Sequence, residues 1–367
     1  MKNSTKLLRV FAIFMITLSL STAITRADDG IKESLQKLAE GVAKEYVGPI
    51  GSAFGANLNS GWMYRSPEAK TFGVDLDFGL VVMGAMFKDE SKKFDLSTSF
   101  TFDNATIDVL TSSLSTLGGF QSAVRNELYG SGLTVNVSGP TVVGAKDDSI
   151  LVSYTGTPVT VNVPGIGDTT FSLTPTNQVL PVTGVLGDLS MLPLAAPQAS
   201  IGTVFGTKLI LRYLPSIEID KKIGKFEYFG FGIQHNPFMF IPVPEPPVDV
   251  SLGFFTQTMT VGTIFESKAT MFGLQASKTF GPGALNVTPY AGFSFEKSEM
   301  TITYEYTTED PTNPSQTITN PIEFKLEGEN KTRFTIGLSF KLAILKINAE
   351  YNLSKYNTIA AGLGIII

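Results

Sequence analysis

The stretch TFGVDLDFGLVV, residues 71–82, decides the fold because its apolar and polar residues alternate with a period of two. The even positions are Phe, Val, Leu, Phe, Leu and Val, whereas the odd positions from 73 to 79 are glycine or aspartate. Strict alternation predicts a β-strand with one apolar and one polar face. A polar run, KDESKK (88–93), and a second alternating stretch, FDLSTSFTF (94–102), follow, so we predict a β-hairpin here.

The C-terminal half repeats this pattern in stretches of about nine to sixteen residues. A strand that crosses a bilayer at a tilt needs roughly nine to eleven residues, whereas soluble strands average about five or six. Strand length therefore favours a membrane barrel over a soluble sandwich. The stretches are TVFGTKLILRYLP (203–215), FEYFGFGIQHNPF (226–238), VDVSLGFFTQ (248–257), ATMFGLQASKTF (269–280), LNVTPYAGFSFEK (285–297), RFTIGLSFKL (333–342), KINAEYNLSKY (346–356) and TIAAGLGIII (358–367).

The first 27 residues predict export. Lys2, Lys6 and Arg9 precede an apolar run, VFAIFMITLSLSTAI (10–24), and small residues follow at Thr25 and Ala27. This order is typical of a secretory signal peptide over residues 1–27. The alternative, an N-terminal membrane anchor, needs a longer apolar run.

The composition agrees with a sheet that meets lipid. Charged residues make up 17% of the chain, against about 25% in soluble domains, and there are 35 glycines and 27 phenylalanines. The absence of cysteine excludes disulfides and thiolate metal sites. The net charge is −5 and no basic stripe occurs, which argues against nucleic acid as a partner.

We therefore predict an all-β fold, a transmembrane antiparallel β-barrel of about 10–14 strands over residues 71–367. It would lie in the outer membrane of a Gram-negative cell, with the lipid bilayer and the barrel assembly machinery as partners. A soluble periplasmic all-β binding protein is an alternative, and it requires the apolar faces to form a core.

Residues 28–70 are predicted to form a helix and a plug, or hatch. IKESLQKLAEGVAKEY (31–46) has the apolar spacing of an amphipathic helix, which we expect Pro49 to end. VGPIGSAFGANLNSGWMY (47–64) follows and contains the only tryptophan. It is not a phosphate-binding loop, because no Lys-Ser or Lys-Thr follows its glycines. Its apolar and amide side chains suit a segment packed in the barrel mouth. The plug candidates are Phe54, Asn57, Asn59, Trp62 and Tyr64.

Residues 103–198 break the strand rhythm, and we predict a large loop or cap insertion there. The alternative is that they supply two or four more barrel strands. DVLTSSLSTLGGFQSAVRNELY (108–129) has helical spacing. We expect two further exposed loops, PVPEPP (242–247) and TTEDPTNPSQTITNP (307–321).

The charged and aromatic residues on the polar strand faces are candidates for a lumen. They form either an ion-pair network that fills the barrel or a path for a polar or amphiphilic solute. The only histidine, His235, cannot be tied to a serine by spacing, so we predict no catalysis, no metal and no cofactor. The lumen candidates are Asp75, Asp77, Lys208, Arg212, Tyr290, Glu296 and Lys341.

Three segments resemble a group of bacterial outer-membrane proteins that carry only a domain-of-unknown-function label. They are GANLNSGWMYRSPEAKTFGVDLDFGL (55–80), SGPTVVG (138–144) and PQASIGTVFGTKLILRYLP (197–215). That group is distantly similar to the FadL-type transporters of long-chain fatty acids, in which an N-terminal hatch lies inside the barrel. The sequence departs from FadL in lacking an Asn-Pro-Ala hatch signature, and its last residue, Ile367, stands where many outer-membrane barrels have an aromatic residue.

The resemblance implies passive transport of hydrophobic or amphiphilic small molecules across the outer membrane, with such a molecule as ligand. The alternative is a structural or adhesive barrel with a closed lumen, whose region 103–198 binds a partner at the cell surface.

Overall fold

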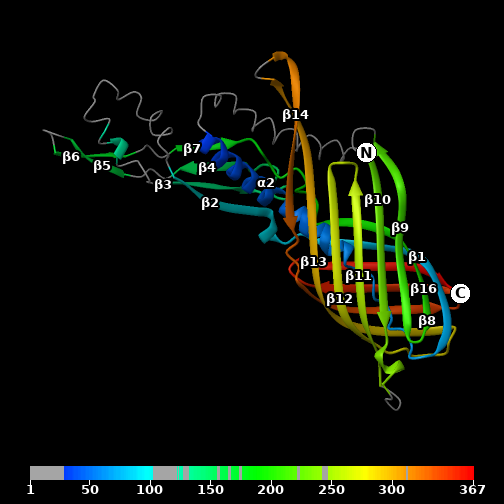
Figure 1. The fold of residues 1–367 in the computed structure, drawn as a ribbon. Coiled ribbons are helices and arrows are strands. Elements are labelled where there is room, and N and C mark those ends of the chain that lie inside the picture. The colour runs from blue at the N-terminus through cyan, green and yellow to red at the C-terminus, as the bar shows by residue number, and fades with distance from the viewer. Residues whose placement is uncertain are drawn as a thin grey trace. The chain divides into compact units, whose positions relative to one another are not determined.

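The structure is a computed structural model that describes residues 29–101, 122, 124–126, 132–154, 158–163, 167–172, 176–220, 224–241, 247–310 and 313–367 (Figure 1). The chain divides into two compact units. Unit 1 comprises Met1–Pro49 and Asp89–Asp188, and unit 2 comprises Ile50–Lys88 and Leu189–Ile367. The predicted signal peptide, 1–27, lies outside the described residues.

Unit 2 is a closed antiparallel barrel of ten strands in the order β1-β8-β9-β10-β11-β12-β13-β15-β16-β17. The ring closes because β17 pairs with β1, and β12 pairs with β13. The predicted fold class is thereby confirmed. The strands are β1 (Phe72–Met86), β8 (Met191–Val204), β9 (Thr207–Asp220), β10 (Gly224–His235), β11 (Asp249–Val261), β12 (Phe265–Ser277), β13 (Leu285–Asp310), β15 (Thr332–Leu342), β16 (Leu345–Leu353) and β17 (Thr358–Ile366).

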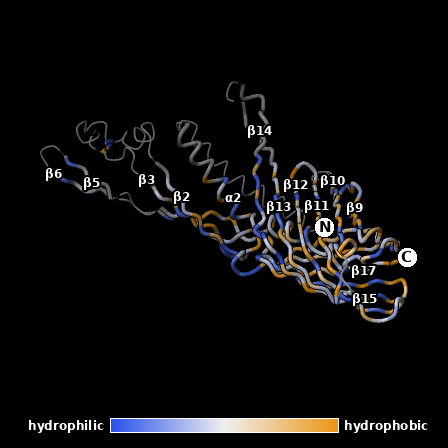
Figure 2. The backbone as a smooth tube through the Cα atoms, turned by 60° about the horizontal axis from the view of Figure 1, so that its bottom comes forward, coloured by the Kyte–Doolittle hydropathy of each residue, from blue (hydrophilic) through white to orange (hydrophobic). Residues whose placement is uncertain are grey.

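The barrel turns its apolar faces outward. On β12, Phe272 and Leu274 are exposed while the neighbouring Met271 and Gln275 are buried. Figure 2 shows hydrophobic and hydrophilic positions alternating along the barrel strands. An apolar exterior around a polar interior is the arrangement of a transmembrane barrel. The soluble alternative does not hold, because the faces that had to form its core lie on the outside.

An arginine on the outward face should therefore be costly. Phe272, 51% exposed, lies between Phe254 and Phe295 on the neighbouring strands. Phe272→Arg is expected to lower the free energy of unfolding in lipid vesicles by about 2–4 kcal/mol, because the charge would face hydrocarbon. Phe272→Leu is the matched control, and urea titration measures both. Equal stability of the two variants would show that this face does not meet lipid.

The two rims of the barrel differ. The rim where β1 begins, which we call the short-turn rim, carries the two-residue turns 205–206 and 343–344 and the connections 236–248 and 278–284. It also carries the chain end, where Ile367 N–H donates to Leu76 O. The opposite, long-connection rim carries the connection 87–190 between β1 and β8 and the hairpin of β13 with β14 (Asn313–Glu327), together with the short connections 221–223, 262–264 and 354–357. The longest connection and the extended hairpin thus lie on the same rim, as the long connections of outer-membrane barrels do.

The predicted loop at 307–321 is wrong. β13 continues to Asp310 and pairs with β14 over Glu299–Asp310, so the described residues 307–310 and 313–321 lie in paired strands beyond the ring. β14 contains Pro314 and Pro321 and has β13 as its one neighbour in the sheet. Proline is tolerated at such an edge because no further strand needs its missing N–H.

The predicted hairpin between residues 71–82 and 94–102 is also wrong. β1 pairs with β8 and β17, whereas β2 (Lys93–Thr101) pairs with β3 (Gly132–Pro140) in unit 1. β4 (Ile150–Tyr154) and β7 (Thr176–Leu180) complete that sheet, and β5 (Pro158–Val163) pairs with β6 (Gly167–Ser172). None of these described strands joins the barrel, but the wall strand β8 begins at Met191, inside the predicted insertion 103–198.

The expectation that the N-terminal helix ends at Pro49 is wrong. Helix α2 (Asp29–Leu58) contains Pro49 and continues for nine residues beyond it. A proline inside a helix costs about 3 kcal/mol, because it removes a hydrogen bond and crowds the preceding turn. The residues that follow are buried, Ala53 and Ala56 completely, and this packing offsets the cost. In unit 1, burial raises the pKa of the Tyr46 phenol, which donates to Thr183 O at 2.8 Å.

The stretch 203–215, predicted as one strand, is interrupted: Phe205 occupies the turn between β8 and β9 with a φ of 48°. Most of the helical pattern at 108–129 and most of PVPEPP lie outside the described residues, although 124–126 are helical. No helix in the described part of the chain combines the length and apolarity needed to cross a membrane.

Candidate functional site

The barrel lumen contains a segment of its own chain, residues 50–66, which we call the plug. It comprises the last turns of α2 and the loop that follows Leu58. Fifteen of its seventeen residues are buried, including polar ones such as Asn57, Asn59 and Ser60. Because the inward wall is also polar, the plug is held largely by hydrogen bonds to wall side chains.

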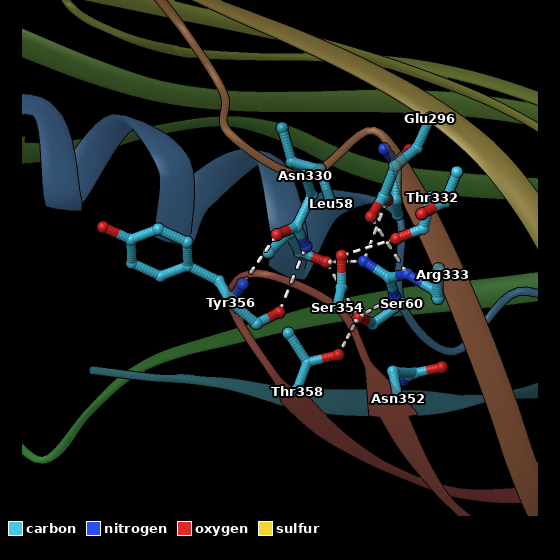
Figure 3. Close-up of polar contacts among 12 residues, drawn as sticks. Leu58, Ser60, Glu296, Asn330, Thr332, Arg333, Asn352, Ser354, Tyr356 and Thr358 are labelled. Atoms are coloured by element: carbon cyan, nitrogen blue, oxygen red, sulfur yellow. Dashed lines mark hydrogen bonds and ion pairs between the residues drawn. The ribbon is translucent and has the colours of Figure 1, made fainter. Parts of the chain in front are cut away.

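Two arginines of the wall bind the C-terminal end of α2. Arg333 on β15 donates through Nη2 to Ala56 O at 2.7 Å and through Nη1 to Ser60 Oγ at 2.6 Å. It also forms an ion pair with Glu296, Nη2 to Oε2 at 2.9 Å (Figure 3). A helix C-terminus carries unpaired carbonyls and partial negative charge, so a cation there is stabilising.

Arg212 on β9 completes this cap and is fully buried. Its Nη2 donates to Ser60 O at 2.7 Å and its Nη1 to Leu58 O at 3.3 Å. Its Nε donates to Gln198 Oε1 at 2.8 Å. These partners are neutral oxygens, and two of the three belong to the plug. Arg212 Nη1 also lies 3.5 Å from the Tyr228 hydroxyl of β10, so Arg212 is held by the wall and the plug together.

Trp62 is the apolar anchor of the plug. Its ring lies under the Arg212 guanidinium at 4.0 Å and 5.2 Å from the ring of Phe255 on β11. A Cβ added at Gly230 on β10 would come within 2.9 Å of the Trp62 ring, so the glycine makes room for it. Met63, Ile210 and Met271 complete this apolar cluster.

Tyr64 joins a charged cluster nearer the short-turn rim. Its hydroxyl donates to Asp77 Oδ2 and accepts from Lys208 Nζ, and Asp77 also pairs with Lys346. Both ammonium groups lie over the phenol ring, at 3.8 Å and 3.6 Å from its centroid. The two lysines thus share one aromatic face, and Lys346 pairs directly with the Asp77 carboxylate.

Backbone and amide contacts fix the remaining plug residues. Glu350 Oε1 on β16 accepts from Gly61 N–H at 2.7 Å. Asn59 Oδ1 accepts from Gln257 Nε2 at 3.1 Å, and Asn57 Nδ2 donates to Leu192 O at 2.7 Å.

The other residues proposed from the sequence lie around this core. Asp75 is half-buried and pairs with Arg65 at 2.6 Å. Tyr290 is buried and donates to Glu350 Oε2 at 3.2 Å. Phe54 packs against Phe265 with ring centroids 5.1 Å apart. Lys341 is half-buried on β15, opposite Lys346.

Sequence reasoning missed Arg333 and Lys346 as lumen residues. Arg333 lies on the same face of β15 as Thr335 and Ser339. It is the first residue of its alternating stretch, where the alternation is least evident. The polar face of β16 contains Asn348, Glu350 and Asn352. Lys346 lies on the same face, and this spacing could have indicated that it points into the lumen. His235 contacts Thr207 Oγ1 at 3.0 Å through Nδ1 and stacks on Phe240.

The family model for a family of unknown function, DUF6588, matches residues 1–367. The chain belongs to DUF6588. No curated protein is significantly similar to this DUF6588 member in sequence.

Among solved structures, the chain is similar to outer-membrane barrels at low scores. OmpT of Vibrio cholerae, in its trimer form, is 10% identical with a TM-score of 0.16, covering 80% of this chain and 99% of its own. The CymD monoaromatic hydrocarbon channel is 9% identical with a TM-score of 0.19, covering 88% and 97%. The anion-selective porin from Comamonas acidovorans is 10% identical with a TM-score of 0.17, covering 80% and 98%.

Proposed function

We propose that this DUF6588 protein is a gated outer-membrane channel in which the plug closes the lumen and its displacement lets hydrophobic or amphiphilic small molecules pass. One observation carries this proposal: the two buried arginines of the polar wall, besides their wall partners Gln198 and Glu296, bind backbone carbonyls of the plug. Arg212 depends on Leu58 O and Ser60 O, and Arg333 on Ala56 O. When the plug moves, water can take over these hydrogen bonds one at a time. Displacing a plug held only by apolar contacts would instead expose apolar surface to water.

The wall also has more polar groups than the plug satisfies. Gln234 Oε1, Ser267 Oγ and Ser294 Oγ are buried on the wall without a hydrogen-bond partner among the described residues. Buried polar groups are normally paired, so a surplus calls for an explanation. A wall that must also line an open, wet lumen supplies one.

The apolar cluster around Trp62 would suit the hydrophobic part of a solute. Phe255, Met271 and Ile210 come from three wall strands and meet at the centre of a polar lumen. When the plug moves, these side chains lose Trp62 and Met63 as partners. An amphiphile could replace both the apolar contacts and the carbonyl groups that Arg212 binds.

A closed structural barrel is the competing function, and a disulfide lock distinguishes the two. Ser66 Oγ of the plug and Ser251 Oγ of β11 are 3.0 Å apart, and the native chain has no cysteine. Ser66→Cys/Ser251→Cys should therefore form a disulfide with little backbone movement. The matched control is Thr279→Cys/Thr288→Cys, whose hydroxyl oxygens are 2.9 Å apart and which joins two wall segments.

In liposomes, a fluorescent alkylated dye should enter through the native protein, the oxidised control and the reduced lock. The oxidised lock should stop dye entry, and a reductant should restore it. Trp62 is the only tryptophan, so acrylamide quenching of its fluorescence reports plug exposure in the same samples. No dye entry in any state, with Trp62 always protected, would favour the closed barrel. Equal entry through the oxidised lock and control would contradict a plug gate.

A further inference from the structure

The plug passes through the barrel from one rim to the other. Near the long-connection rim, Glu329 N–H donates to Ser52 Oγ at 3.3 Å, and a Cβ at Gly51 would lie 3.4 Å from Leu326 Cβ on β14. Halfway along, Gly61 N–H donates to Glu350 on β16. Contacts of residues 51 to 61 therefore descend from the rim into the lumen in chain order.

The same order continues to the opposite rim. Ser66 N–H donates to Ser277 Oγ at 3.1 Å at the end of β12, and Pro67 O accepts from Asn236 Nδ2 at 2.8 Å just after β10. Lys70 O then accepts from Gly206 N–H at 3.0 Å in the short turn between β8 and β9. The chain enters β1 at Phe72 from there and runs back along the wall.

This path differs from that of a plug whose chain terminus lies inside the lumen. The plug continues covalently at both ends: into β1 at the short-turn rim, and into the earlier turns of α2 at the long-connection rim. The chain before Ile50 therefore leaves the barrel at the rim opposite to the one where β1 begins.

The lengths of the connections on the two rims indicate on which side of the membrane the chain leaves the barrel. In outer-membrane barrels short turns face the periplasm and long connections face the exterior. The short-turn rim of this barrel carries two two-residue turns and no connection longer than 236–248, whereas the long-connection rim carries residues 87–190. We infer that the lumen serves as the exit route of the protein's own chain, so that residues 29–49 are displayed outside the cell.

Outward threading also determines how the plug can respond. A ligand or partner that pulls on the exposed segment before Ile50 acts directly on the plug, because α2 is continuous through Leu58. The other end is tethered to β1 by five residues, 67–71, which limits outward movement to about 17 Å at full extension. The inference itself holds whether or not any solute passes.

Single cysteines in the cysteine-free chain test the threading. Glu45→Cys marks the exposed face of α2, Lys225→Cys marks the long-connection rim and Ala284→Cys marks the short-turn rim, and all three native residues are exposed. Intact cells that carry each full-length variant in the outer membrane are treated with a membrane-impermeant maleimide, before and after permeabilisation. Heat-modifiable gel migration confirms that each variant folds.

Glu45→Cys and Lys225→Cys are expected to react in intact cells, and Ala284→Cys only after permeabilisation. If Glu45→Cys and Ala284→Cys react under the same condition and Lys225→Cys reacts under the other, residue 45 lies on the side of the short-turn rim and the threading is wrong. If Ala284→Cys alone reacts in intact cells, the barrel has the opposite orientation and the display of residues 29–49 outside is wrong. Dye transport does not enter this test, so its failure is distinguishable from failure of the proposed channel.

Discussion

Arg333→Met is expected to lower the free energy of unfolding by about 3–5 kcal/mol, because it leaves the buried Glu296 carboxylate without its counter-charge. Both side chains are only 1% exposed, and their ion pair measures 2.9 Å. The substitution also removes the donors to Ala56 O and Ser60 Oγ at the end of α2. Urea titration in lipid vesicles, followed by far-ultraviolet circular dichroism, measures the loss.

A second substitution separates the two causes. Glu296→Gln in the Arg333→Met background removes the uncompensated charge, so part of the stability should return, while the loss of the α2 cap remains. The control pair is Lys268 and Glu266, 3.0 Å apart but with side chains 60% and 38% exposed. Lys268→Met should cost less than about 1 kcal/mol, as exposed ion pairs do. If Arg333→Met costs no more than this control, the arginine does not hold the plug.

The barrel could be predicted from the sequence because lipid imposes a simple pattern on its wall. In β1, Phe78 and Leu80 are exposed while Asp77 and Val81 are buried, as the alternation indicates. Each wall strand must present apolar side chains to hydrocarbon, so every strand carries the signal by itself.

Strand pairing could not be predicted in the same way, because alternation is local. β2 alternates as well as β1 does, yet its buried Phe94 belongs to the sheet of unit 1. The hairpin of β13 and β14 was mistaken for a loop because its proline and threonine residues are compatible with an edge strand as well as with a turn. The sequences of β2 and β14 do not indicate which strand each will pair with.

The candidate site was only half accessible to sequence reasoning. Trp62 and Tyr64 stand out in a glycine-rich segment, and the structure places both in the lumen. Their partners come from strands far along the chain: Arg212 lies over Trp62, and Lys346 lies over Tyr64. Such contacts depend on barrel register, which a single sequence does not reveal.

Trp62→Ala is expected to lower the free energy of unfolding by about 3–5 kcal/mol, since truncating a buried tryptophan leaves a cavity. Trp62 is 1% exposed and packs between Arg212 and Phe255, so the neighbouring strands cannot close the space without moving the wall. The loss of the cation–π contact adds to the cost. Urea titration in vesicles, followed by heat-modifiable gel migration, measures stability without a tryptophan signal.

The same variant should make the lumen leak. Without Trp62 the plug keeps its polar contacts to Arg333 and Glu350 but loses its apolar anchor, so dye entry into liposomes should exceed that of the native protein. Trp62→Phe is the matched control, because it keeps an aromatic face under Arg212 and should lose less stability and leak less. A Trp62→Ala variant as stable and as tight as Trp62→Phe would mean that the ring does not anchor the plug. Closure would then rest on the two arginines that cap α2.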